Sequence, residues 1–183
     1  LWSGKVTRLR LDPPGEKDAE VEIDYIRIIQ GPISSHDPTS PVWDFAGNNG
    51  GWIAVTGGGH LAQTPEGAKA TLAAESVNLT GPAVDLQAAD YKYAMVHLVA
   101  GAPLTAMLYW SATDDGNFPG CNQIIFDVSA GTSTLNLRLT DNPMYDGEIK
   151  RLRLSLEGAV GTEVTLKQLA LVATPQGPAS LKV

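Results

Sequence analysis

Apolar and polar residues alternate along most of this chain with the two-residue period of a β-strand. In residues 134–139 (TLNLRL) the leucines share one face, whereas Thr134, Asn136 and Arg138 share the other. Strands with more buried character are predicted at residues 93–100 (YAMVHLVA), 104–110 (LTAMLYW) and 122–128 (NQIIFDV). Short segments rich in Gly, Pro, Asn and Asp separate them, which is typical of an all-β sandwich or barrel.

Helical signals are weak, and only residues 86–90 are expected to hold a single helical turn. The 19 glycines and 12 prolines indicate many turns rather than long helices. A net charge of −7 argues against a nucleic-acid partner, because phosphate binding needs a basic face. No apolar stretch approaches the roughly 18 residues of a membrane-spanning helix, so membrane insertion is not expected.

Cys121 is the only cysteine, which excludes an intramolecular disulfide and a cysteine-based zinc site. No basic and apolar leader precedes Leu1, so we expect the chain to be an excised or processed piece.

Two distant segments match each other without a gap. Residues 4–28 read GKVTRLRLDPPGEKDAEVEIDYIRI, and residues 147–171 read GEIKRLRLSLEGAVGTEVTLKQLAL. Two interpretations are open. Any two amphipathic hairpins look alike because alternation alone makes them so; or the chain holds one whole module and the last hairpin of a preceding homologous module. The ungapped match and the shared Arg-Leu-Arg-Leu core favour the second.

The start and end of the predicted module resemble a known family. Residues 43–59 (WDFAGNNGGWIAVTGGG) and 145–171 look like the opening and closing segments of jelly-roll modules with a galactose-binding-like fold. Such modules occur as carbohydrate-binding domains of secreted glycan-degrading enzymes, and similar segments occur in phage tail-tip and tail-fibre proteins. The resemblance implies an all-β jelly-roll β-sandwich, with an extra N-terminal β-hairpin from the preceding module. It also implies a structural calcium ion, for which the sequence identifies no ligands.

Composition and the repeat together divide the chain into four parts. These are residues 1–29, the C-terminal hairpin of a preceding homologous module; 30–42, a Pro/Ser-rich linker; 43–172, the jelly-roll module; and 173–183, a linker or tail. A two-stranded hairpin alone is marginally stable in water, so it must dock on the main module, pair with another chain or belong to an upstream domain. Its exposed strand edges would allow homo-oligomerisation.

Residues 109–122 (YWSATDDGNFPGCN) carry the side chains that a sugar site needs, namely aromatic rings for stacking and polar groups for the hydroxyls. The candidate ligand-binding residues here are Trp110, Asp114, Asp115, Asn117, Phe118 and Asn122. Adjacent Tyr109 and Trp110 must point to opposite faces of a sheet, so at most one packs in the core. The alternative is that Trp110 is the core residue and the loop is an Asp-Asp-Gly turn.

Trp52 is a further candidate, because it follows a Gly-Asn-Asn-Gly-Gly loop, whereas Trp43 and Phe45 share a face and are expected in the core. Arg138 and Arg153 lie on strand faces, where each would grip a hydroxyl or carboxylate pair or form a surface ion pair.

No catalytic motif is present: the sequence contains no Gly-x-Ser-x-Gly elbow, His-Glu-x-x-His helix or Walker loop. Candidates for a hydrolytic pair of carboxylates exist by residue type only, and they are Asp114, Asp115 and Asp127. We therefore predict no enzyme, but a non-catalytic carbohydrate-binding or adhesion module of a larger extracellular or virion-surface protein. Its expected partners are a glycan or cell-surface polysaccharide and other modules of the same polypeptide. The alternative is a structural spacer or assembly domain of a phage tail fibre or tip with no ligand of its own.

Overall fold

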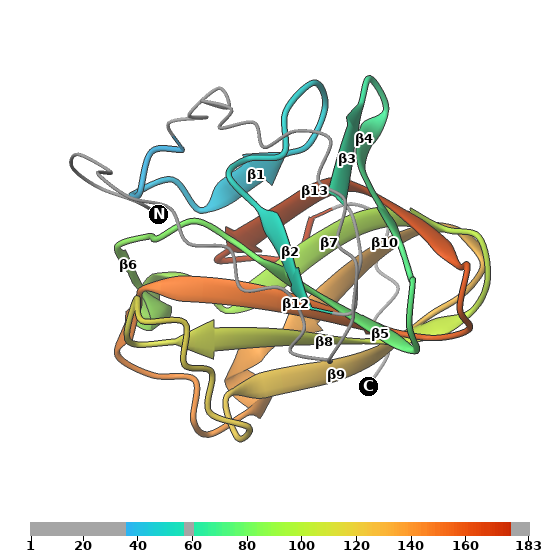
Figure 1. Cartoon of the computed structure of the whole chain (residues 1–183). Helices are drawn as coiled ribbons and strands as arrows, with labels where there is room; N and C mark the ends of the chain where they lie inside the picture. The colour runs from blue at the N-terminus through green and yellow to red at the C-terminus, as the bar shows by residue number, and fades with distance from the viewer. Residues whose placement is uncertain (1–35, 57–60, 177–183) are drawn as a thin grey trace, which may run out of the picture. The chain divides into compact units, whose positions relative to one another are not determined.

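The computed structural model describes residues 36–56 and 61–176. In this part the chain forms two antiparallel sheets and a short two-stranded ribbon, and the apolar faces of the two sheets share one hydrophobic core (Figure 1). The predicted all-β sandwich is therefore confirmed. Among these residues, no helix is long and apolar enough to cross a membrane.

The larger sheet, called sheet A here, has the strand order β10-β7-β13-β4-β3, with β1 paired to β13. Its strands are β1 (Val42–Asp44), β3 (Leu61–Thr64), β4 (Gly67–Thr71), β7 (Tyr93–Ala100), β10 (Gly131–Arg138) and β13 (Glu163–Val172).

The second sheet, sheet B, has the order β2-β5-β12-β8-β9, and several of its strands run side by side in the lower part of Figure 1. Its strands are β2 (Ile53–Thr56), β5 (Ser76–Thr80), β8 (Leu104–Ser111), β9 (Gln123–Val128) and β12 (Arg151–Glu157). The ribbon pairs β6 (Leu86–Gln87) with β11 (Glu148–Ile149), and two short 3-10 turns follow β6 and β10: η1 (Ala88–Asp90) and η2 (Leu139–Asp141).

The strands predicted from alternation are present. β7 has the predicted bounds, β8 and β9 agree with prediction to within one residue, and η1 lies in the predicted helical turn. β10 begins earlier than predicted, at Gly131, whose positive φ of 92° turns the chain between β9 and β10.

Residues 147–171 do not form the hairpin that the sequence predicted. β12 lies in the middle of sheet B between β5 and β8, whereas β13 lies in sheet A between β4 and β7. Alternation identifies a strand but not its partner, and the connection between these strands crosses from one sheet to the other. The equivalent N-terminal segment, residues 1–29, lies outside the described residues, as does the tail from residue 177.

Three aromatic side chains fill one end of the core. Trp52 packs edge-on against Trp43 and Phe45, with ring centroids 5.9 and 6.1 Å apart. Gly81 makes this packing feasible, because a Cβ there would lie 2.9 Å from the Trp52 ring. The core positions predicted for Trp43 and Phe45 are confirmed, since both are buried.

The described end of the predicted linker, residues 36–42, contacts the sandwich. The His36 ring stacks on Trp43 with centroids 4.9 Å apart, and the Leu171 N–H donates to the Pro41 carbonyl at 2.8 Å. Val42 already belongs to β1. This segment is therefore held against sheet A by specific contacts.

Candidate functional site

The outer face of sheet B carries a row of side chains fixed by strand register. Arg153 on β12 lies beside Thr80 of β5 and Tyr109 of β8, and Tyr109 lies beside Gln123 of β9. Alternation turns Leu152 and Leu154 of β12 into the core, which leaves Arg153 on the opposite face. The sequence of β12 therefore places an arginine next to a tyrosine on the solvent side of the sheet.

Tyr109, Phe118 and Arg153 form a compact group, called the aromatic–arginine cluster here. The Arg153 guanidinium carbon lies 4.4 Å from the Tyr109 ring centroid and 4.5 Å from that of Phe118. The two rings meet edge to face, with centroids 6.4 Å apart. A guanidinium on aromatic rings at this range is held by cation–π attraction, so the cluster is a preorganised surface.

Phe118 reaches the cluster from the loop between β8 and β9, which Asp115 shapes. The Asp115 carboxylate accepts hydrogen bonds from the Thr113 hydroxyl at 2.6 Å and the Asn117 N–H at 2.9 Å. These two hydrogen bonds lower the pKa of the Asp115 carboxyl below its usual value, and the bond from Thr113 makes the larger contribution. Asp115 therefore acts as a turn former that positions the residues before Phe118.

The remaining loop candidates lie around this turn. Asp114 and Asn117 are exposed, and Asn122 is half-buried. The Asn122 carbonyl accepts from the Trp110 N–H at 3.2 Å, and its side chain accepts from the Cys121 thiol. Of the predicted loop residues, the structure brings only Phe118 into the cluster, and the ligand roles of the others stay predictions.

Trp110 and Trp52 do not fit the sugar-stacking role that the sequence suggested for them. Trp110 is 2% exposed, packs edge-on against Tyr145 at 5.1 Å, and donates its Nε1–H to the Met144 carbonyl at 3.2 Å. Trp52 is 0% exposed. Both rings are enclosed by the core, so neither offers a face to a ligand, and the alternative core position of Trp110 is the correct one.

Tyr109 belongs to the cluster but is not among the ligand-binding residues that the sequence predicted. Its ring lies on the outer face because Trp110, its neighbour, lies on the inner one. The sequence predicted that at most one of these two residues packs in the core, and the burial of Trp110 shows which one does.

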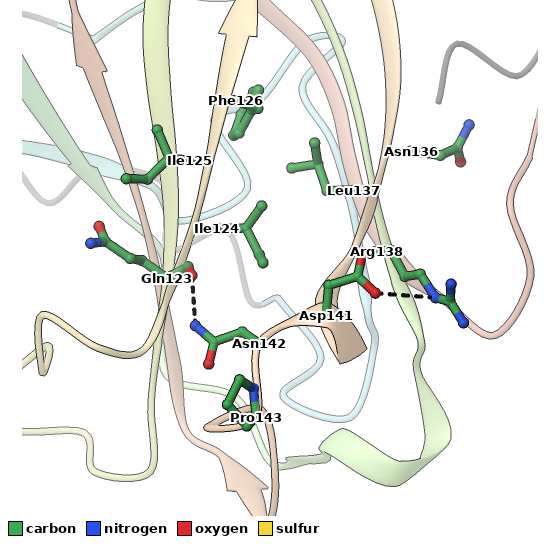
Figure 2. A pocket seen from close by; sticks show the side chains of 10 residues that line it. All are labelled: Gln123, Ile124, Ile125, Phe126, Asn136, Leu137, Arg138, Asp141, Asn142 and Pro143. Atoms are coloured by element: carbon green, nitrogen blue, oxygen red, sulfur yellow. Dashed lines mark hydrogen bonds and ion pairs between the residues drawn. The ribbon is translucent and has the colours of Figure 1, made fainter. Parts of the chain in front are cut away.

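A separate groove lies between the edge strands of the two sheets, β9 and β10, with a volume of about 440 Å³ (Figure 2). Figure 2 shows Ile124 and Leu137 between the two strands. The groove is lined by Gln123, Ile124, Ile125, Phe126, Asn136, Leu137, Arg138, Asp141, Asn142 and Pro143.

Most polar groups of this groove already have partners. Asn142 donates to the Cys121 and Gln123 carbonyls, both at 2.8 Å, and Arg138 pairs with Asp141 at 3.5 Å. For Arg138, the predicted alternative of a surface ion pair is therefore the observed one. Gln123 Oε1 is an exception, since it is buried and has no hydrogen-bond partner among the described residues.

Other predicted chemistry is not assembled in the described ranges. Within residues 36–56 and 61–176, no group of three or more His, Cys, Asp or Glu side chains is placed to hold a metal ion. Asp127, a hydrolytic candidate by type, lies on β9 and accepts a bond from the Thr105 hydroxyl at 3.3 Å.

No protein-family model matches the sequence, and no curated protein matches it. Solved structures do match the fold. A family 29 carbohydrate-binding module has a TM-score of 0.50 at 12% identity, over 73% of this chain and 86% of that one. A variant of such a module, made to probe ligand recognition, has a TM-score of 0.51 at 11% identity, over 74% and 91%.

The glycoside hydrolase domain of Endo-D from Streptococcus pneumoniae R6 has a TM-score of 0.51 at 14% identity, over 69% of this chain. The chain spans only 22% of that larger structure. At such identities the likeness concerns the fold alone. The protein is thus a β-sandwich of the kind found in carbohydrate-binding modules.

Proposed function

We propose that the sandwich is a non-catalytic carbohydrate-binding module of a larger extracellular protein, and that its ligand binds on the outer face of sheet B. The observation that carries this proposal is the aromatic–arginine cluster, Tyr109, Phe118 and Arg153, on a fold shared with carbohydrate-binding modules. Sugar rings present apolar C–H faces that pack on aromatic rings, while their hydroxyls accept hydrogen bonds from a guanidinium.

The cluster suits this role because its parts are held before any ligand arrives. Arg153 and Tyr109 sit on central strands of sheet B, and the Asp115 turn fixes the loop that carries Phe118. Binding then orders few side chains, which limits its entropic cost. The exposed polar residues Asp114 and Asn117 of the same loop would reach hydroxyls at the edge of the bound sugar.

A glycan-array screen of the purified chain tests the proposal, with Tyr109→Ala and Phe118→Ala beside the wild type. We expect saturable binding that weakens by at least about tenfold in each variant, since each removes a stacking ring. Tyr93→Ala is the matched control, because Tyr93 is a half-buried tyrosine on sheet A. Its binding should equal that of the wild type.

Two outcomes contradict the proposal in different ways. Binding that survives both cluster substitutions would show that the ligand site lies elsewhere. No binding to any glycan would contradict the function itself and would favour the structural spacer that the sequence left as an alternative.

A further inference from the structure

The outer face of sheet B carries two arginines that have no close ion pair among the described residues. Arg151 and Arg153 are two residues apart on β12 and therefore share this face. Neither forms an ion pair with a carboxylate of the described residues, whereas Lys69, Arg138 and Lys150 each do. The chain has 20 acidic residues against 13 basic ones, so carboxylates are not scarce.

Hydrogen bonding at the two guanidinium groups is also incomplete. The Nε atoms of Arg151 and Arg153 are buried and have no acceptor in the described part of the chain. A buried hydrogen-bond donor without an acceptor costs free energy, and a charged donor costs more than a neutral one. The Asp115 carboxylate on the adjacent loop accepts hydrogen bonds from Thr113 and Asn117, and its charge also interacts with that of Arg151, although the two form no ion pair.

The rings of the cluster define how Arg153 can be reached. The guanidinium carbon of Arg153 lies 4.4 Å from the Tyr109 ring centroid and 4.5 Å from that of Phe118, and the two centroids are 6.4 Å apart, so the rings meet the guanidinium from two directions roughly at right angles. The Nε atom is buried, so a ligand would reach the terminal nitrogens of the planar fork, which match the two oxygens of a carboxylate.

Charge along the face is divided between its two ends. Arg151 and Arg153 stand at one end of β12, and Glu157 stands at the other. Glu157 lies beside Thr105, and Thr105 lies beside Asp127. Glu157 and Asp127 therefore repel an anionic ligand at the far end, whereas at the other end the two arginines offset the charges of Asp114 and Asp115 on the adjacent loop.

We infer that the preferred ligand of this face is an acidic glycan, whose uronate carboxylate pairs with Arg153 and Arg151 while a sugar ring packs on the aromatic rings. This inference rests on the proposed function and specifies its ligand class. It follows from charge complementarity, because two guanidiniums that form no ion pair with a described carboxylate lie beside a stacking surface.

The test compares acidic polysaccharides with uncharged forms of the same backbone. Polygalacturonate, alginate and hyaluronan are each titrated into the full chain, beside the same polymer with its carboxyl groups methyl-esterified. We expect at least one acidic polymer to bind at least about tenfold more tightly than its ester, as a charge-assisted bidentate contact requires. Because the chain itself carries a net charge of −7, non-specific attraction of polyanions is disfavoured.

Variants then assign the effect to the two arginines. Arg153→Gln and Arg151→Gln should each lose at least about tenfold in affinity for the acidic polymer. Arg153→Lys keeps the charge but not the fork, so it should lie between wild type and Arg153→Gln. Lys92→Gln removes a positive charge from an exposed residue outside the site and should bind as wild type. Thermal unfolding of every variant separates lost binding from lost folding.

The outcomes distinguish the two proposals. Equal affinity for acidic and esterified polymers, or binding to neutral glycans alone, would overturn the acidic ligand and leave the carbohydrate-binding function standing. No binding to any glycan would contradict both. Tight acidic binding that Arg151→Gln and Arg153→Gln leave unchanged would also overturn the inference.

Discussion

Asn136 and Gln176 exchange two hydrogen bonds: the Asn136 Nδ2 donates to the Gln176 carbonyl, and the Gln176 N–H donates to the Asn136 Oδ1, each at 3.0 Å. Asn136 is 2% exposed and lies on β10, opposite Met95 of β7. Its side-chain amide both donates to and accepts from the backbone of one residue, as the backbone of a paired strand does. The segment that follows β13 is thereby fixed to sheet A by a side chain.

We predict that Asn136→Ala lowers the free energy of unfolding by about 1–3 kcal/mol, because two backbone groups lose their partners. Urea denaturation of both proteins measures this. Gln176→Ala is the matched control: Gln176 contributes only backbone atoms to the pair, so its truncation should change stability very little. A stable Asn136→Ala protein would show that water replaces the amide at no cost.

Trp110 and Tyr109 are adjacent in sequence, but their truncation should affect different properties. We expect the Trp110 variant to lose stability and the Tyr109 variant to lose glycan binding. Trp110→Ala removes a core ring and its bond to Met144, so we expect a loss of about 3–5 kcal/mol of stability. Tyr109→Ala removes an outer-face ring, so glycan binding should fall while stability changes by less than about 1.5 kcal/mol. Denaturation and glycan titration on both variants check this. Similar stability losses in the two variants would contradict the division of roles.

Gly67 should not tolerate a side chain. Its φ of 144° lies in a region that favours glycine, and a Cβ there would meet the Leu166 carbonyl oxygen at 2.1 Å. Gly67→Ala is expected to cost about 3 kcal/mol or more, because backbone strain and a contact with fixed backbone add together. Gly120→Ala is the control, since nothing lies within 4 Å of its added Cβ. Thermal unfolding of both variants compares the two sites directly.

The sequence predicted individual strands well because alternation is a local property. β7 followed from one segment read in isolation, and so did the burial of Leu135 and Leu137 on β10. Strand partners were not local. The repeat in residues 147–171 predicts a hairpin, but β12 and β13 pair with strands far away in sequence.

The candidate site was predicted only in outline for the same reason. The loop with Phe118 could be named from its composition, yet its partner Arg153 comes from a strand that follows much later in the chain. Alternation fixed Tyr109 and Trp110 to opposite faces without saying which face was the core. Trp52 looked exposed because its loop is glycine-rich, but the missing Cβ of Gly81 makes room for its ring inside.

Tyr145 should make the protein lose stability in alkali. It is buried against Trp110, and burial, with a smaller contribution from Tyr91, raises the pKa of its hydroxyl above the ordinary value of about 10. The unfolded chain then releases this proton first, so the stability present below about pH 10 falls by about 1.4 kcal/mol per pH unit above it. Tyr145→Phe removes the proton, and the hydroxyl has no hydrogen-bond partner among the described residues, so the variant should fold normally. Urea denaturation from pH 8 to pH 11 should show a constant difference between the two proteins up to about pH 10, and above it a growing advantage for Tyr145→Phe. Parallel curves over the whole range would mean that the hydroxyl ionises as readily in the folded protein as in the unfolded chain.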